Sequence, residues 1–191
     1  TLIPRPETET LVEWALALPL PDDAEVLDLG TGSGAIALAL ASERPHWRMW
    51  AADASEGALQ VARANAGRLG YQRVTFLASD WYAALDGRRF DLLVSNPPYI
   101  DPDDPHLDRG DLRFEPRGAL VASASGLADL AHLAAGASRH LRPGGWLLLE
   151  HGWEQAAPVR ALLTKTGFRS IETRRDLAGR ERVSGGCRDA E

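Results

Sequence analysis

Apolar residues recur along the chain with two different spacings, and these spacings predict a regular succession of strands and helices. Short continuous apolar runs bounded by turn residues are typical of buried strands, whereas apolar positions three and four residues apart are typical of helices. The predicted strands are 25–30, 48–53, 73–80, 90–95 and 145–152, with 169–176 and 180–188 as candidate final strands. The predicted helices are 7–18, 33–43, 55–70, 126–141 and 154–168, and Pro143 is expected to stop the fourth of them.

The alternation of strand and helix from residue 25 to residue 168 predicts the fold class. This order is typical of an α/β protein with a doubly wound, mostly parallel sheet and helices on both faces. The chain has 191 residues, so we expect a single domain over 1–191, with residues 1–21 as a leading segment and helix. A long irregular stretch, 96–125, follows the strand 90–95, and this fold class binds ligands at the carboxyl ends of strands.

A glycine-rich loop connects the first predicted strand to the helix after it. Glycines allow a tight turn and let a ligand approach the backbone at the start of a helix. The loop also fits the dinucleotide fingerprint G-x-G-x-x-A, and Asp53 ends the next strand about 20 residues on, where a ribose-binding acid is expected. Such an acid suits the ribose of NAD and of S-adenosylmethionine equally well, so the loop predicts a nucleoside-bearing cofactor without deciding which one. The loop consists of Gly30, Thr31, Gly32, Ser33 and Gly34, and Ala35 completes the fingerprint.

Asp80 and Trp81 follow the third predicted strand, again at a carboxyl end. In one interpretation, the acid accepts a hydrogen bond from an adenine amino group and the indole covers the adenine ring. In the other, Asp80 caps a helix and Trp81 belongs to the core. The spacing of these residues alone does not decide between the two.

The tetrapeptide Asn96-Pro97-Pro98-Tyr99 directly follows the strand 90–95. A planar amide or aromatic amine nitrogen is a poor nucleophile because its lone pair is delocalised. Two hydrogen-bond acceptors that hold the N–H groups of this nitrogen return electron density to it and orient it for methyl transfer. The Asn96 side-chain oxygen and the Pro97 carbonyl are the candidate acceptors. Pro98 biases Pro97 toward an extended conformation, and Tyr99 offers a flat face for stacking. An ordinary turn is the alternative, but the position at a strand end favours an acceptor clamp, for which NAD chemistry has no use.

Charge, cysteine and histidine content narrow the function classes. The 21 basic and 27 acidic residues give a net charge of −6, which disfavours binding to the phosphates of nucleic acid. Cys187 is the single cysteine, and the five histidines show no metal-ligand spacing. We therefore expect no disulfide, no metal site and a cytoplasmic location. No apolar run approaches the roughly 20 residues of a membrane span.

Six stretches together resemble the HemK-type methyltransferases, which methylate the glutamine side-chain nitrogen of peptide-chain release factors. They are, in order, PRPETE, VLDLGTGSGAIALALA, SDW, SNPPYI, DPHLDRGDLRFEPRGAL and LLLEHG. The resemblance implies a Rossmann-like class I S-adenosylmethionine-dependent methyltransferase fold, with seven strands of which the last is antiparallel. Members of this family carry an N-terminal helical domain that helps to grip the release factor. This sequence opens where the catalytic domain is expected to begin, so we expect it to lack that domain.

The resemblance also implies ligands and site residues. S-adenosylmethionine is expected at Gly30 to Gly34, Asp53 and Trp81, with Asp80 and Asn96 as further contacts. The substrate glutamine, which lies in the Gly-Gly-Gln motif of the release factor, is expected at Asn96 to Tyr99. The nearest rival is an amino-methyltransferase that acts on adenine in DNA or RNA and uses the same clamp. An NAD-dependent oxidoreductase and a non-catalytic cofactor-binding module are rivals from other classes.

Overall fold

Strands and helices alternate along the chain as the hydrophobic pattern predicts. A computed structural model describes residues 5–98 and 126–190, so Tyr99 lies outside the described residues. The strands are β1 (Glu25–Leu29), β2 (Arg48–Asp53), β3 (Thr75–Ala78), β4 (Phe90–Ser95), β5 (Leu141–Glu150), β6 (Arg169–Arg175) and β7 (Glu181–Cys187). The helices are the short 3-10 helix η1 (Pro6–Thr8), α1 (Glu9–Ala17), α2 (Ala35–Glu43), α3 (Glu56–Leu69), α4 (Ala128–His140) and α5 (Ala156–Lys165).

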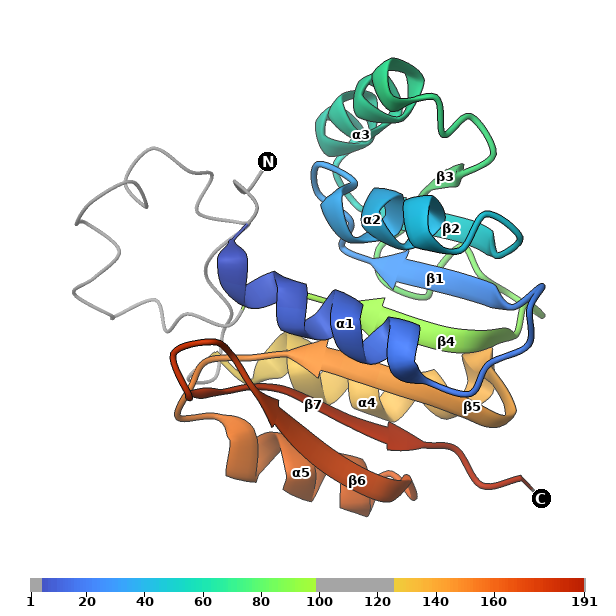
Figure 1. The fold of residues 1–191 in the computed structure, drawn as a ribbon. Helices are drawn as coiled ribbons and strands as arrows, with labels where there is room; N and C mark the ends of the chain where they lie inside the picture. The colour runs from blue at the N-terminus through green and yellow to red at the C-terminus, as the bar shows by residue number, and fades with distance from the viewer. Residues whose placement is uncertain (1–4, 99–125, 191) are drawn as a thin grey trace.

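The described strands form one seven-stranded sheet with the order β3-β2-β1-β4-β5-β7-β6. The pairs from β3 to β5 are parallel, whereas β7 runs antiparallel to both β5 and β6. This topology confirms the predicted doubly wound sheet with its antiparallel final strand (Figure 1). The chain reverses its direction of winding between β1 and β4, and in such sheets the carboxyl ends of the strands at this switch point form the binding crevice.

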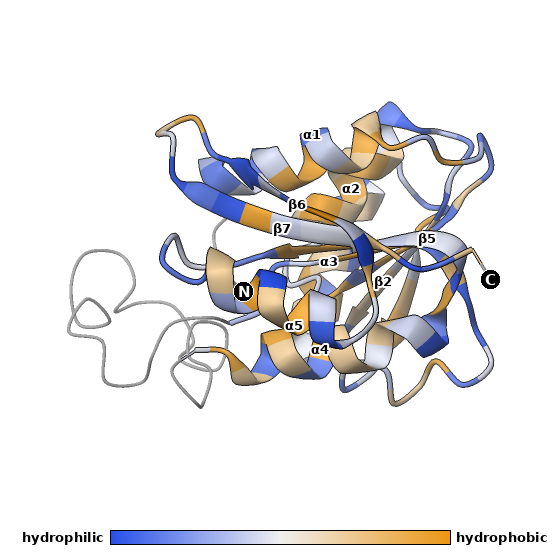
Figure 2. Cartoon of the chain, turned by 90° about the horizontal axis from the view of Figure 1, so that it is seen from below, coloured by the Kyte–Doolittle hydropathy of each residue, from blue (hydrophilic) through white to orange (hydrophobic). Residues whose placement is uncertain are grey.

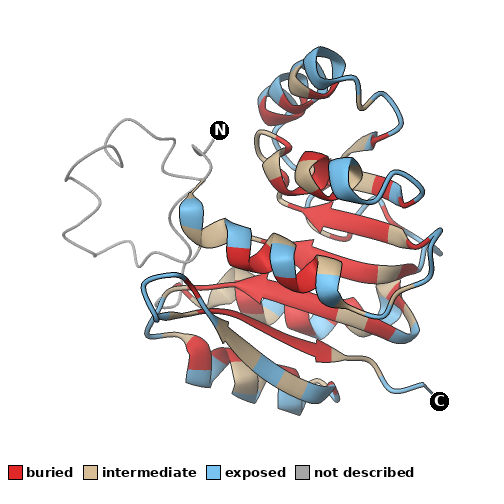
Figure 3. Cartoon of the chain, in the orientation of Figure 1, coloured by how far each residue is buried: buried red, intermediate tan, exposed pale blue. Residues whose placement is uncertain are grey.

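Helices cover both faces of the sheet, because successive side chains of each strand point to opposite faces. Val26 and Val94 belong to the core under α1 and α2, whereas their neighbours Leu27 and Leu93 belong to the core under α4 and α5. Figure 2 shows α1 and α2 on one side of the sheet and α4 and α5 on the other. The central strands β1 and β4 are largely buried, whereas the outer strands β3 and β6 keep exposed residues, as do the helices (Figure 3). Within the described residues, no helix has the length and apolar character needed to cross a membrane.

Pro143 does not stop a helix, as the sequence suggested, but lies inside β5. Helix α4 ends at His140 and β5 begins at Leu141. The pairing of β4 with β5 shifts here, because β4 advances two residues, from Phe90 to Leu92, while β5 advances five, from 141 to 146. Pro143 therefore sits in a bulge, where the ladder does not need the backbone N–H that proline lacks.

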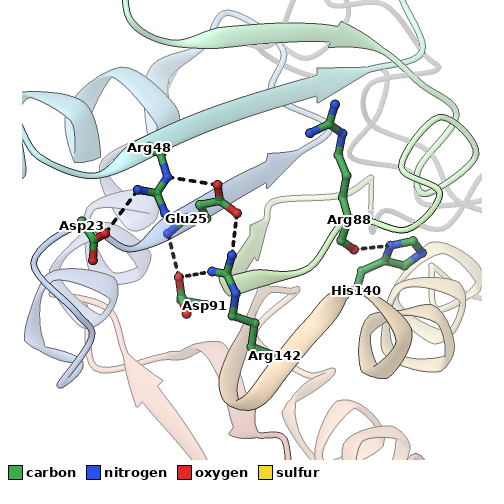
Figure 4. Close-up of polar contacts among 7 residues, drawn as sticks. All are labelled: Asp23, Glu25, Arg48, Arg88, Asp91, His140 and Arg142. Atoms are coloured by element: carbon green, nitrogen blue, oxygen red, sulfur yellow. Dashed lines mark hydrogen bonds and ion pairs between the residues drawn. The ribbon is translucent and has the colours of Figure 1, made fainter.

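A group of charged residues forms ion pairs beside this bulge, at the amino ends of the strands (Figure 4). Arg142 reaches Asp91 at 2.5 Å and Glu25 at 2.7 Å. The Asp91 carboxylate also accepts the backbone N–H of Glu25 at 2.7 Å, and Arg48 adds ion pairs to Glu25 and Asp23. These contacts join β1, β2, β4 and β5 at one edge, and so help to fix the register of the strands whose opposite ends form the crevice.

Candidate active site

A cavity of about 550 Å³ opens at the carboxyl ends of the parallel strands. The loops after β1, β2, β3 and β4 border it, together with the segment that leads into α1. Its lining includes most of the predicted site residues: Gly30, Thr31, Gly32, Ser33, Asp53, Asp80, Trp81, Asn96 and Pro98. Arg5, Thr8 and Asp129 also line it, and sequence reasoning did not single them out. The structure thus brings together residues from six separate segments of the chain, because Asp129 belongs to α4.

The glycine loop turns sharply between β1 and α2, and all three of its glycines have positive φ. Gly30 has φ of 72°, and a Cβ there would lie 3.3 Å from the Trp81 ring. Gly34 has φ of 82° and is the N-cap residue directly before α2, and a Cβ there would lie 3.1 Å from the Cβ of Ala62. L-residues rarely adopt such positive φ values. Gly34 is not among the residues that line the cavity, so its observed part is in the turn and in packing against α3.

Asp53 ends β2 and holds the glycine loop through its carboxylate. One oxygen, Oδ2, accepts the backbone N–H of Gly32 at 2.9 Å, and Oδ1 accepts the backbone N–H of Ser55 at 2.8 Å. A carboxylate oxygen has lone pairs for more than one hydrogen bond. The two oxygens are therefore oriented by the backbone and still have the capacity to accept hydroxyl groups from a ligand in the cavity.

Asp28, in β1, is a fully buried acid that the sequence reasoning did not single out. Its Oδ2 accepts the Thr31 hydroxyl at 2.6 Å and the Ala37 backbone N–H at 3.2 Å, whereas Oδ1 is buried without a hydrogen-bond partner. Burial raises the pKa of Asp28 to about 7, against the lowering effect of these two hydrogen bonds. Asp28 therefore links β1, the glycine loop and the first turn of α2. Its place two residues before Gly30, the first residue of the loop, was the only signal in the sequence.

Asp80 and Trp81 both line the cavity, and Trp81 also packs against the core between the sheet and α4, so the position of the pair is compatible with both interpretations. Trp81 has φ of 47°, a rare conformation for a bulky residue, and the Ser79 hydroxyl holds it by donating to its carbonyl at 2.7 Å. Asp129, from the first turn of α4, receives a hydrogen bond from the Trp81 side chain, and burial raises the pKa of this carboxyl. Asp129 therefore holds the indole ring, while Ser79 holds the backbone of the same residue.

Asn96, Pro97 and Pro98 follow β4 directly, as predicted. Asn96 and Pro98 line the cavity, whereas Pro97 is buried and is not among the lining residues. The Asn96 side-chain nitrogen Nδ2 donates to the Thr8 hydroxyl at 3.3 Å. Tyr99 lies outside the described residues. Among the residues that the structure describes, no group of three or more His, Cys, Asp or Glu side chains is placed to hold a metal ion.

Comparisons with known proteins agree with this arrangement. Residues 8–109 match the family described as Methyltransferase small domain. The chain is 57% identical to the release factor glutamine methyltransferase of Pseudomonas aeruginosa, over 96% of this chain and 67% of that protein. It is 58% identical to the protein of the same name from Burkholderia pseudomallei, over 97% of this chain and 67% of that protein.

A comparison with a solved structure also identifies the fold as that of a methyltransferase. The crystal structure of the protein-(glutamine-N5) methyltransferase (release factor-specific) from Alicyclobacillus acidocaldarius matches 98% of this chain and 94% of that chain, with a TM-score of 0.60 and 30% identity. The sheet described above is therefore the Rossmann-like sheet of class I methyltransferases, and the chain belongs to the release factor glutamine methyltransferase family.

Proposed function

We propose that this chain transfers a methyl group from S-adenosylmethionine to the side-chain amide nitrogen of the glutamine in the Gly-Gly-Gln motif of peptide-chain release factors, with 1–191 as the catalytic domain. The observation that carries the proposal is the single cavity that has Gly30, Gly32 and Asp53 on one side and Asn96 and Pro98 on the other. A cofactor and a planar amide bound there would share one cavity. The names of the relatives support the substrate.

The residues of the cavity fit S-adenosylmethionine. Its volume of about 550 Å³ lies within the usual range for small-molecule sites. The Asp53 carboxylate would accept the two ribose hydroxyls, the backbone of the glycine loop would contact the methionine part, and Trp81 with Asp80 would hold the adenine. When bound, S-adenosylmethionine supplies a methyl group on a positively charged sulfur.

Asn96 and Pro97 would prepare the substrate amide for its attack. The Asn96 Oδ1 atom accepts one N–H of the substrate glutamine, and the Pro97 carbonyl accepts the other. These two bonds hold the nitrogen in one direction and strengthen as positive charge develops on it, so they stabilise the transition state more than the bound substrate. Pro98 restricts the backbone of Pro97 to extended conformations and so aims its carbonyl.

The adenine amino-methyltransferase remains chemically compatible with the same clamp, but the relatives named for release factors do not favour it. The net charge of −6 also supports a protein substrate over nucleic acid. We propose a cytoplasmic location, which the free Cys187 supports, because unpaired cysteines are common where thiols stay reduced.

The decisive experiment is mass spectrometry of a release factor after incubation with this chain and S-adenosylmethionine. The expected product carries one methyl group on the glutamine of the Gly-Gly-Gln motif. A methylated adenine, or no transfer to the release factor, would overturn the proposal.

Asn96→Ala tests the clamp itself. We expect kcat to fall about 10²–10³-fold, as when one preorganised polar group is removed from an active site, with little change in cofactor affinity. Asn96→Asp keeps an acceptor oxygen and should retain more activity. Single-turnover methyl transfer at saturating cofactor measures both variants, and a melting curve shows that each is folded. A folded Asn96→Ala variant with the wild-type rate would mean that the tetrapeptide is only a turn.

A further inference from the structure

The Thr8 hydroxyl lies where the N-terminal helix meets the candidate acceptor clamp. Thr8 is the residue at which η1 ends and α1 begins, and its half-buried side chain lines the cavity. A threonine at the start of a helix usually accepts a backbone N–H from the first turn. Thr8 makes no such capping bond. Its hydroxyl instead accepts the Asn96 Nδ2 group at 3.3 Å, across 88 residues of sequence.

The packing of α1 holds Thr8 in this position. Thr8, Leu11 and Ala15 stand three and four residues apart, so they share one face of the helix. Leu11 and Ala15 are fully buried against the sheet, in the same core as Val94 of β4. Asn96 stands two residues after Val94, which is the spacing that returns a side chain to the same face of the sheet. The helix and the strand therefore present the two side chains to each other.

The contact has a chemical consequence for the asparagine. An Asn amide has two orientations that differ only by exchange of its oxygen and nitrogen, and rotation about the last side-chain bond interconverts them. Only one of them presents Oδ1 to a substrate N–H, whereas the other presents an N–H group, which would repel it. With Nδ2 on the Thr8 hydroxyl, Oδ1 is left for the cavity.

We infer that Thr8 is a positioning residue for methyl transfer, which accepts the Asn96 Nδ2 group and so holds the amide in the orientation that presents its oxygen to the substrate. The inference rests on the proposed function, in which that oxygen accepts the substrate N–H. Thr8 itself need not touch the substrate or the cofactor. The effect on kcat of removing the Thr8 hydroxyl should therefore depend on the residue at position 96. This dependence distinguishes a positioning role from a general role in folding.

The test is a double-mutant cycle that combines Thr8→Val with Asn96→Asp. Valine matches threonine in shape but has no hydroxyl. In the Asn96 background, Thr8→Val should lower kcat about 3–10-fold, the effect of one lost neutral hydrogen bond, with the dissociation constant of S-adenosylmethionine changed less than about 2-fold. A carboxylate has two equivalent oxygens and no wrong orientation. In the Asn96→Asp background, the same change should therefore alter kcat by less than about 2-fold.

Two variants serve as controls. Thr8→Ser keeps the hydroxyl and should restore kcat to within about 2-fold of the wild type. Thr10→Val makes the same change on the same helix, at a buried residue that does not line the cavity, and should leave kcat within about 2-fold. Equal losses for Thr8→Val in both backgrounds, or no loss in either, would overturn the inference.

A readout without turnover separates this inference from the proposed function. In isotope-labelled protein, the two Nδ2 proton resonances of Asn96 report on the hydrogen bond to Thr8. We expect Thr8→Val to shift them and Thr8→Ser to leave them nearly unchanged. If the wild-type chain transfers no methyl to a release factor, the proposed function fails. If the resonances do not respond to Thr8→Val, the positioning role fails whatever the activity.

Discussion

The buried acid Asp28, which links β1, the glycine loop and α2, can be tested without cofactor or substrate. Burial raises its pKa from 3.8 to about 7. A carboxyl with a raised pKa binds a proton more tightly in the folded protein than in the unfolded chain. Its contribution to stability is therefore fully present below pH 3.8 and is lost as the pH rises to about 7. Above that pH, the folded protein carries the whole cost of a buried carboxylate whose Oδ1 has no hydrogen-bond partner.

The size of the effect follows from the two pKa values. The difference between 3.8 and about 7 corresponds to about 4 kcal/mol of unfolding free energy, at about 1.4 kcal/mol for each pKa unit. Asp28→Asn removes the titration, and its amide oxygen can still accept the Thr31 hydroxyl. The stability of the wild type relative to this variant should therefore decrease by a few kcal/mol between pH 4 and pH 8, with most of the decrease below pH 7.

Urea unfolding of both proteins at a series of pH values measures this difference. Comparison with the variant cancels the other titrating groups, which both proteins share. Asp91→Asn is a matched control for the replacement of a carboxyl by an amide. The Asp91 carboxyl is only partly buried, lies at the opposite end of the strands and is paired with Arg142. Parallel stability curves for wild type and Asp28→Asn across this range would refute the argument that Asp28 is buried at a cost.

Two further predictions concern Asp53 in the site and Gly136 in the core. Asp53→Ala should raise the dissociation constant of S-adenosylmethionine about 10²-fold in calorimetry, because two hydrogen bonds to a charged group are lost at about 1.5 kcal/mol each; a change below about 3-fold would contradict the ribose role. Gly136→Ala would place a Cβ 2.4 Å from Cε2 of Tyr82 and should destabilise the protein by about 1–3 kcal/mol in thermal melts. Gly67→Ala, whose Cβ would meet no atom within 4 Å, should not destabilise it.

The half of the site assigned to the cofactor could be predicted because it is built from local units. The glycine loop and Asp53 each follow directly from a strand, and strand, loop and helix are contiguous in sequence. Parallel pairing then brings Leu29 of β1 beside Ala52 of β2, so the ends of neighbouring strands meet without further information. Periodicity predicts the strands, and the fold class places their ends at one edge.

Two features escaped prediction because they depend on contacts between distant residues. Pro143 looked like a helix stop because proline breaks helices, but the bulge that accommodates it depends on pairing with β4 and on the charges of Glu25 and Asp91. Asp129 lies at the start of α4, and only the folded chain brings it to Trp81. Neither the pairing of the Pro143 bulge with β4 nor the contact of Asp129 with Trp81 can be identified from the residues adjacent in sequence.

The half assigned to the substrate is built differently, and this difference bears on its function. Asn96 stands at a strand end that the sequence reveals, but its amide can turn, and the group that holds it comes from the N-terminal segment, 88 residues away. The glycine loop is shaped by its own glycines and by Asp53, whereas the orientation of the Asn96 amide, whose oxygen is the proposed acceptor, depends on how α1 docks against the sheet. A change that shifts α1 should therefore reduce the rate of methyl transfer more than the affinity for the cofactor. Thr8 moves with the helix, whereas Asp53 and Gly32 remain joined to each other.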